Sequence, residues 1–248
     1  MSKIAAIVFA LDPAHSDSKP RDKLPFKRLN DQPTFLRSLE LFMGRDDVEQ
    51  TILVIDPSDV EFVKEKFSAH LGFGGVSLAA GGPDMFTAVA AAMEKLDDNI
   101  EIVALHDALR PAVSVMQIDK LFETVKECDG TVLAMPLTGA MKRVDGDLKI
   151  TETFSLTGIY LSQYPQVFQR EALVAAEQQR ESLDQTPLDH AQLAESAGKS
   201  IVVVTGSPLN VLLSEPSQTT LASAAIKALP KPKVKKAASP FADEKQMW

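Results

Sequence analysis

Short apolar runs that alternate with longer amphipathic stretches constrain the fold of this chain more than any other feature. The apolar runs predict buried strands at residues 4–11, 50–55, 76–79, 100–106, 130–136 and 200–205. The stretches between them predict helices at residues 34–43, 59–71, 85–96, 114–128, 170–181 and 188–197. Because apolar strands separated by helices are typical of a parallel sheet covered on both faces, we expect an α/β fold with a mostly parallel sheet.

Length and charge narrow the class of protein. The chain has 248 residues and a formal net charge of -8. That length fits one large α/β domain, which we place at residues 1–227. The net charge argues against a protein that wraps nucleic acid, since such binding needs a basic face. The apolar run at residues 4–11 is too short to span a bilayer, so we expect a cytoplasmic protein without membrane contact.

The C-terminal segment and the cysteine content complete the organisation. Residues 228–248 are rich in Pro, Lys and Ala with little periodicity, which predicts a disordered basic tail. Cys128 is the single cysteine, so an internal disulfide and a multi-thiolate metal site are excluded.

One segment, residues 135–156, departs from the α/β rhythm. Asp145-Gly146 lies between two alternating apolar and polar stretches, which predicts a hairpin with a tight, positive-φ turn. A hairpin inserted into a parallel sheet has edges that must be covered. A second subunit clasped by this arm would cover them, and so would folding back onto its own domain.

The loop after the first strand is basic. Residues 11–29 contain Lys19, Arg21, Lys23, Lys27 and Arg28. These cations suit either a polyphosphate clamp or a solvated loop. The loop has no glycine, so its backbone lacks the residues that form a tight phosphate-binding nest.

Two further loops follow strands at the edge where open α/β sheets bind ligands. Gly81-Gly82 and Asp84 fit either a close approach to a nucleotide base or a plain turn capped by Asp84. After the next strand, Asp107 fits either a Mg²⁺ ligand or a partner of Arg110 that closes a turn. We expect the neighbouring His106 to pack at the strand end, since Mg²⁺ prefers oxygen ligands.

Together these loops resemble those of the 2-C-methyl-D-erythritol 4-phosphate cytidylyltransferases, from about residue 4 to residue 226. The most specific match is VALHDALRP at 103–111, which is similar to the family's V-H-D-A-A-R-P. Weaker matches follow in the family's order: Gly81-Gly82, residues 136–143, residues 164–168 resembling T-P-Q-x-F, and residues 188–191 resembling T-D-[DE]-A.

The resemblance implies a Rossmann-like, three-layer nucleotidyltransferase fold whose β-arm, at about residues 135–156, clasps a homodimer. It implies a step of isoprenoid precursor biosynthesis, in which a cytidylyl group passes from CTP to a sugar-alcohol phosphate with Mg²⁺. It assigns the metal to Asp107, catalysis to Lys23, Arg21 and Lys27, the nucleotide to Ala10, Leu11, Gly81, Gly82 and Thr87, and the acceptor to Arg110, Lys142 and Arg143.

The chain departs from the family pattern at several charged positions. The glycines of the family's first loop, A-A-G-x-G-x-R-M, are missing, and the lysine of the following P-K-Q has Lys23 as its nearest replacement only after a shift in register. Met85 and Ala88 replace an arginine and a serine, Leu156 falls near the arm arginine, and Leu212 replaces a lysine. Positioning and charge neutralisation carry most of the rate in phosphoryl transfer, so these exchanges bear directly on activity.

The sequence therefore supports a divergent cytidylyltransferase as the leading hypothesis. The alternatives are a catalytically silent dimeric homologue that binds a ligand or acts as a scaffold, and a nucleotidyltransferase with a changed acceptor. The apolar replacements at Met85, Leu156 and Leu212 would suit a less phosphorylated acceptor.

Overall fold

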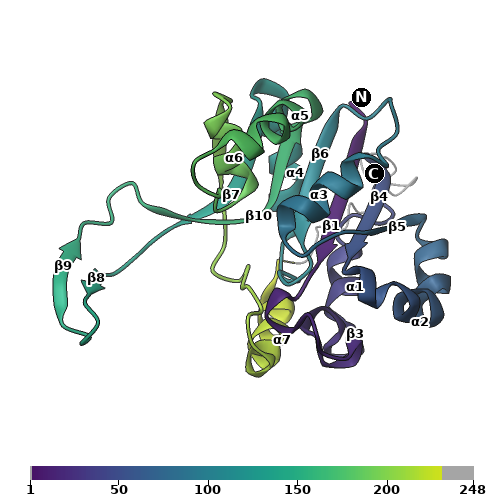
Figure 1. The fold of residues 1–248 in the computed structure, drawn as a ribbon, viewed down its shortest axis with the longest axis horizontal. Helices are drawn as coiled ribbons and strands as arrows, with labels where there is room; N and C mark the ends of the chain where they lie inside the picture. Colours follow the sequence, from purple (N-terminus) through teal and green to yellow (C-terminus); the bar gives the residue numbers. More distant parts are fainter. Residues whose placement is uncertain (1, 231–248) are drawn as a thin grey trace, which may run out of the picture.

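A twisted seven-stranded sheet forms the centre of the computed structural model, which describes residues 2–230 (Figure 1). The strand order is β11-β7-β10-β6-β1-β4-β5. The strands are β1 (Ile4–Ala10), β4 (Val48–Ile55), β5 (Val76–Ala80), β6 (Ile102–Asp107), β7 (Gly130–Pro136), β10 (Tyr160–Gln169) and β11 (Ile201–Thr205). The expected α/β fold with a mostly parallel sheet is confirmed.

The strand β10 was not expected from the sequence. It pairs antiparallel with both β6 and β7, and it is the one reversed strand in this sheet of the described chain. Its first residues are exposed and polar side chains interrupt it, so it contains no continuous apolar run. The register of its pairing with β7 shifts between Gln163 and Gln166.

Helices cover both faces of the sheet. On one face lie α1 (Thr34–Leu39), α2 (Val60–Phe73) and α4 (Val115–Thr124), and on the other lie α3 (Met85–Met93), α5 (Arg170–Gln179) and α6 (His190–Ser196). The central strand β1 serves both layers, because Val8 points into the first core cluster and Ile7 into the second. Such alternation is the period-two geometry of a strand buried on both sides.

Shorter elements complete the described chain. A final helix, α7 (Thr219–Ala228), was missed because its small, weakly amphipathic residues hide the helical period. It packs against β2 (Arg28–Leu29), which pairs with β3 (Gln32–Pro33). Single 3-10 turns occur at Pro13–His15, Pro20–Asp22, Leu24–Phe26, Pro57–Asp59, Val125–Glu127, Arg180–Ser182 and Pro216–Gln218.

The expected hairpin is present as β8 (Met141–Val144) and β9 (Ile150–Phe154), and it projects away from the sheet rather than folding back (Figure 1). The expected tight turn at Asp145-Gly146 is wrong. The Asp145 carboxylate accepts hydrogen bonds from the amides of Asp147 and Lys149, which produces a longer loop. Positive φ occurs at Leu148 instead.

Two expectations concern the ends of the chain and membrane contact. Most of the predicted tail, residues 231–248, lies outside the described residues, and α7 ends at Ala228. Between residues 2 and 230, no helix is both long enough and apolar enough to cross a membrane.

Candidate active site

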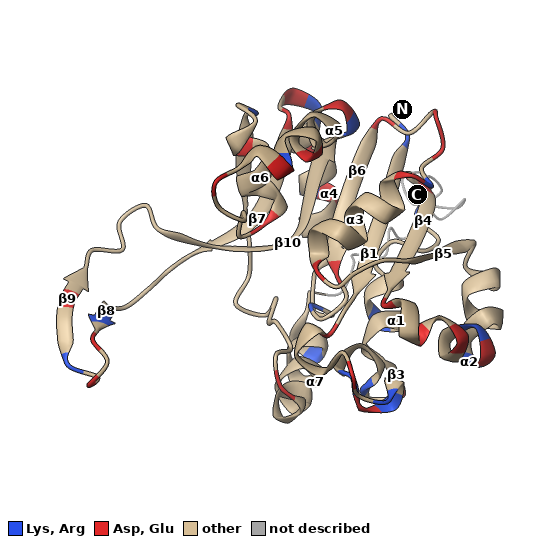
Figure 2. Ribbon diagram, in the orientation of Figure 1, with Lys and Arg blue, Asp and Glu red and all other residues tan. Residues whose placement is uncertain are grey.

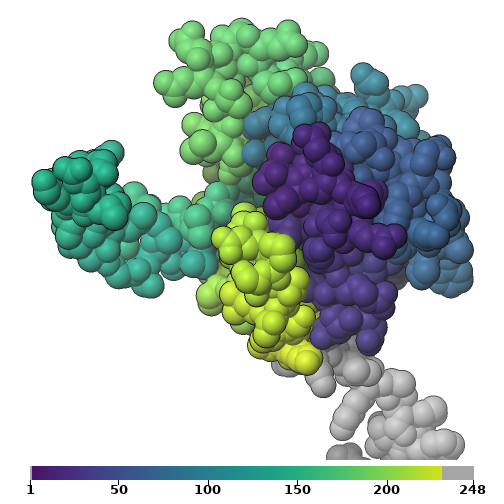
Figure 3. Space-filling view, turned by 60° about the horizontal axis from the view of Figure 1, so that its bottom comes forward, coloured from purple at the N-terminus to yellow at the C-terminus, as the bar shows by residue number. Residues whose placement is uncertain are grey.

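A cleft of about 640 Å³ opens at the carboxyl ends of β1 and β6, where open α/β sheets bind their ligands. Leu11 and Asp12 reach it from β1, Asp107 from β6, and Met85 from the start of α3. The lining also includes Arg180, Thr186, Pro187 and residues 212–214. The N-terminal loop (purple) and the segment that contains α7 (yellow) lie side by side at this end of the molecule (Figure 3).

The charge of the cleft differs from that of a basic polyphosphate clamp. Among the described residues, three carboxylates line it, from Asp12, Asp84 and Asp107, and Arg180 is its one basic side chain. The remaining wall is largely apolar and includes Met85 and Leu212, two positions where the family has cations. The cleft lining therefore combines acidic side chains with apolar ones.

Asp107 ends β6 inside this cleft. Its Oδ1 accepts a hydrogen bond from the amide of Leu109 at 2.8 Å, and its carbonyl accepts one from the amide of Arg110. Within residues 2–230 its Oδ2 has no hydrogen-bond partner. Burial raises the pKa of Asp107 to about 6, against the opposing effects of the Leu109 amide and the Arg110 charge.

The side chain of Arg110, in the same turn, contacts a different partner from Asp107. Its Nη1 donates to the carbonyl of Asn210 at 3.0 Å, and it does not pair with the Asp107 carboxylate. Burial lowers the pKa of Arg110, and the charge of Asp107 opposes that shift. The preceding His106 is fully buried beside the Phe42 ring, and burial lowers its pKa to about 3, so it is neutral.

Lys23 does not reach the cleft. Its Nζ donates to both carboxylate oxygens of Asp59, at 2.8 and 3.0 Å, and to the Ser58 hydroxyl at 3.2 Å. Both charged side chains are 2% exposed. Burial raises the pKa of Asp59, although the Lys23 ammonium opposes the shift. The ammonium expected to clamp phosphate thus fixes the N-terminal loop to the start of α2.

The remaining loop cations lie near the surface, outside the cleft lining. Lys19 and Arg21 are exposed, and Lys27 is 3.7 Å from the Asp22 carboxylate. Figure 2 shows basic and acidic residues interleaved around this loop beside β3. The structure therefore does not assemble the expected basic cluster.

The two glycines of the Gly81-Gly82 turn differ in their surroundings. A Cβ on Gly81 would lie 2.9 Å from both the Cα of Ala88 and the Cγ1 of Val54, so α3 packs against the sheet at this point. Gly82 has φ +143, and a Cβ there would meet only Leu11, at 3.7 Å. A Cβ at Gly82 would therefore make an ordinary van der Waals contact with Leu11, a cleft residue, and the positive φ is what favours glycine there.

Asp84 caps α3, which favours the simpler of its two interpretations. Its Oδ1 accepts hydrogen bonds from the amides of Phe86 and Thr87. The hydroxyl of Thr87, an expected nucleotide contact, donates to the Asp84 carbonyl. The first amides of this helix are thus occupied by the cap.

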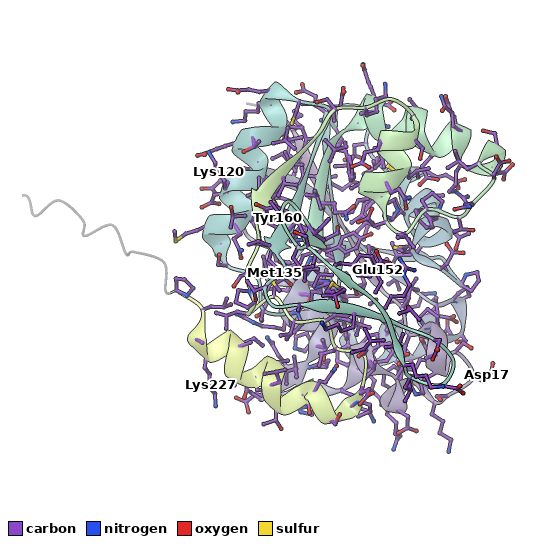
Figure 4. All side chains as sticks on the ribbon, turned by 90° about the vertical axis from the view of Figure 1, so that its left-hand side faces the viewer. Asp17, Lys120, Met135, Glu152, Tyr160 and Lys227 are labelled. Carbon is purple, nitrogen blue, oxygen red and sulfur yellow. The ribbon has the colours of Figure 1, made fainter. Side chains whose placement is uncertain are left out.

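Lys142 and Arg143 lie on the projecting arm, and neither lines the cleft of its own chain. Lys142 donates to Thr153, and Arg143 pairs with Glu152 at 3.2 Å and lies over the Phe154 ring. Figure 4 looks along the arm: Met135 and Tyr160 mark where β7 and β10 leave the body, and Glu152 lies on β9.

Beneath the cleft lies a buried polar cluster that the sequence did not reveal. His190 is fully buried, its Nδ1 is 3.0 Å from the Tyr164 hydroxyl, and its ring lies 4.7 Å from that of Phe86. Burial lowers the pKa of His190 to about 3. Asp189 caps α6 and accepts a hydrogen bond from Gln166. These residues come from the two weak motifs at 164–168 and 188–191, which the fold brings together.

Residues 9–228 match the family model described as IspD, 2-C-methyl-D-erythritol 4-phosphate cytidylyltransferase. The chain belongs to the IspD family. The matched region runs from the last two residues of β1 to the end of α7, and it includes β6, the strand that ends in Asp107.

Individual IspD relatives are similar over most of their length. A 2-C-methyl-D-erythritol 4-phosphate cytidylyltransferase of Bacillus velezensis is 30% identical over 204 residues, covering 82% of this chain and 87% of the relative. One from Geobacter metallireducens is 30% identical over 227 residues, covering 89% and 97%.

Solved IspD structures share the fold. The 4-diphosphocytidyl-2C-methyl-D-erythritol synthase of Anaerococcus prevotii superposes with a TM-score of 0.77 at 20% identity, covering 91% of this chain and 96% of that chain. The Thermus thermophilus 2-C-methyl-D-erythritol 4-phosphate cytidylyltransferase gives 0.74 at 19% identity, covering 92% and 100%. The expected nucleotidyltransferase fold is confirmed.

Proposed function

We propose that this IspD family member transfers a cytidylyl group from CTP to 2-C-methyl-D-erythritol 4-phosphate in the cleft beside Asp107. The observation that carries the proposal is the position of that carboxylate, at the end of β6, within the cleft and with one oxygen free of hydrogen bonds to the described residues. A phosphate oxygen of the acceptor would attack the α-phosphorus of CTP, and pyrophosphate would leave from the opposite side.

Asp107 is compatible with the Mg²⁺ ion that the family implies. The described residues contain no group of three or more His, Cys, Asp or Glu side chains that could hold a metal ion. Mg²⁺, however, is commonly held by one or two carboxylates together with substrate phosphates and water. The Asp107 carboxylate would hold the ion, and the bound ion would supply neutralisation of phosphate charge.

The nucleotide would enter beside Leu11 and Gly82. Leu11 lines the cleft, Gly82 lies next to it, and Ala10 precedes it at the end of β1. Gly81 contributes indirectly, because its close packing holds α3 in place. This arrangement would accommodate a flat base against the backbone rather than against long side chains.

The exposed cations of the N-terminal loop would neutralise the phosphate charge that Mg²⁺ leaves uncompensated. Lys19 and Arg21 are the nearest replacements for the arginine of the family's first loop, each after a shift in register. We propose that Lys19, Arg21 and Lys27 turn toward the triphosphate when it binds, since their side chains are not buried in the free protein. Lys23, fixed on Asp59, has no part in this proposal.

We also propose that the protein is a homodimer clasped through the arm. Met141, Val144 and Ile150 are exposed on β8 and β9, and such apolar surface on a projecting hairpin favours a protein partner. Lys142 and Arg143 would then serve the acceptor site of the partner subunit.

Replacing Met141 and Ile150 with Asp should convert dimer to monomer in analytical ultracentrifugation, and Lys149→Glu on the same arm should not. A wild-type monomer at micromolar concentration would contradict the proposal.

A second candidate function is ligand binding without turnover. It is favoured by the acidic cleft and by the burial of Lys23, which together leave the triphosphate with fewer fixed cations than phosphoryl transfer normally uses. A silent homologue would keep the fold and the dimer but lose the chemistry.

Pyrophosphate release separates the two candidates. Purified protein is given CTP, methylerythritol phosphate and Mg²⁺, with Asp107→Ala as the control. Release that falls by about a hundredfold or more in the control supports the transferase. Thermal stabilisation by Mg-CTP without release supports the binding protein, since a ligand stabilises the state that holds it.

A further inference from the structure

We propose that Arg180 binds a phosphate group of the substrate in this cleft and that Glu177 is the positioning residue that orients it. The inference rests on the proposed function, because it assigns a role within the same cleft. Neither residue belongs to a motif by which the chain resembles its family.

The position of Arg180 is the first observation. It begins the 3-10 turn that follows α5, and it lines the cleft together with residues at the ends of β1 and β6. It is the one basic side chain in the described lining, where three carboxylates provide the other charges. A phosphorylated ligand therefore meets a single fixed cation from the protein, and that cation is a guanidinium.

The orientation of the guanidinium is the second observation. Its Nε donates to Glu177 Oε2 at 3.0 Å, and within residues 2–230 its two Nη groups have no hydrogen-bond partner. A guanidinium held through Nε presents its Nη groups as a planar pair of donors, a geometry that suits phosphate oxygens. The Arg180 side chain is 27% exposed, and the residue lines both this cleft and a neighbouring pocket of about 320 Å³ that it shares with Glu177.

The support behind Glu177 is the third observation. Its side chain is 14% exposed, and burial raises its pKa while the charge and hydrogen bond of Arg180 oppose that shift. Its buried Oε1 lies 4.0 Å from the buried Nε2 of His190, and neither atom has a hydrogen-bond partner in the described chain. Among the described residues, Arg180 is therefore the one side chain that donates a hydrogen bond to the Glu177 carboxylate.

The floor beneath this pair is rigid. His190 is held by the Tyr164 hydroxyl and packed against Phe86, which itself lines the cleft. Side chains fixed by packing and by supporting hydrogen bonds hold a binding group in one geometry. Arg180 is therefore preorganised, in contrast to the exposed cations of the N-terminal loop.

The test measures binding of two phosphate-bearing probes to the full-length protein by calorimetry with Mg²⁺: CTP and methylerythritol phosphate. Arg180→Met should weaken the binding of one of them by about tenfold or more, as expected for a lost charge-assisted hydrogen bond, and Arg180→Lys should recover part of it. The affected probe identifies whether the nucleotide or the acceptor supplies the phosphate. The same probe should show a raised KM in steady-state kinetics.

Two variants complete the design. Arg37→Met is the matched control, because Arg37 also pairs with a glutamate three residues away, Glu40, and its side chain is 30% exposed. It should leave both affinities unchanged. Glu177→Gln should weaken the same probe as Arg180→Met, and the double variant should add little to the Arg180 effect. A purely structural role for Glu177 would lower thermal stability without changing affinity.

The outcomes are distinguishable. If wild type binds a probe and Arg180→Met, folded by circular dichroism, binds both as tightly, the assignment of Arg180 is overturned while the proposed function stands. If Arg180→Met weakens binding in a protein that releases no pyrophosphate, the assignment stands and the transferase proposal fails. If wild type binds neither probe, both fail.

Discussion

At the scale of single residues, the ion pair of Lys23 and Asp59 determines what the N-terminal loop can offer a ligand. Both side chains are almost fully buried, and the ammonium reaches both carboxylate oxygens. Removing one partner of such a pair leaves an uncompensated buried charge. The pair therefore belongs to the stability of the loop rather than to phosphate binding.

Lys23→Met should consequently lower the free energy of unfolding by about 3–5 kcal/mol, measured by urea denaturation. Lys27→Met, which removes a partly exposed lysine 3.7 Å from Asp22, should cost less than about 1 kcal/mol. Replacing both members, with Lys23→Met and Asp59→Leu, should recover most of the loss. Wild-type stability in Lys23→Met would mean that the ammonium is free for ligand.

The buried charge of Asp107 should lower the free energy of unfolding at neutral pH. Its pKa is raised to about 6 by burial, so the folded protein keeps a proton that the unfolded chain loses near pH 4, and stability falls as pH rises between these values. Asp107→Asn keeps an acceptor for the Leu109 amide and removes the charge. Its melting temperature should exceed that of wild type by a few degrees at about pH 8 and match it at about pH 4. Equal melting temperatures at both pH values would show that Asp107 is not destabilised by burial.

At the scale of elements, the contact of α3 with the sheet positions one wall of the cleft. Gly81→Ala would place a methyl group 2.9 Å from backbone of α3 and from Val54. It should lower the free energy of unfolding by about 1–3 kcal/mol, as overpacking does, and weaken Mg-CTP binding by displacing Met85 and Phe86. Gly72→Ala, in α2 with no atom within 4 Å of the added Cβ, should be neutral or stabilising by up to about 1 kcal/mol in the same denaturation. Similar unfolding energies for the two variants would contradict a packing role for Gly81.

Elements with a clear hydrophobic pattern, either a continuous apolar run or a helical period, could be predicted, and those built from mixed residues could not. β1 and β6 are continuous apolar runs, so their ends, and with them Asp107, were located from the sequence. β10 is half exposed and α7 is rich in small residues, so neither carries a clear period. Arg180 could not be assigned, because its approach to the cleft depends on how α5 ends against the buried His190 cluster.

At the scale of the whole molecule, a fold shared with IspD enzymes carries a cleft whose charges differ from the family pattern. Several family cations are replaced by apolar residues, Lys23 is buried, and Arg180, which lies outside the family motifs, lines the cleft. Charge neutralisation and positioning carry phosphoryl transfer, so Asp107, Arg180 and the exposed loop cations must supply them together if the protein transfers a cytidylyl group.

The fate of the α-phosphate tests this requirement most directly. Protein is incubated with Mg²⁺, methylerythritol phosphate and CTP radiolabelled at the α-phosphate, and the products are separated by chromatography. We expect label to move from CTP to a cytidine diphospho-sugar alcohol with wild-type protein and to stay in CTP with Asp107→Ala. Label that remains in CTP with wild-type protein, under conditions where an active IspD enzyme converts it, would show that this protein is not a cytidylyltransferase for this acceptor.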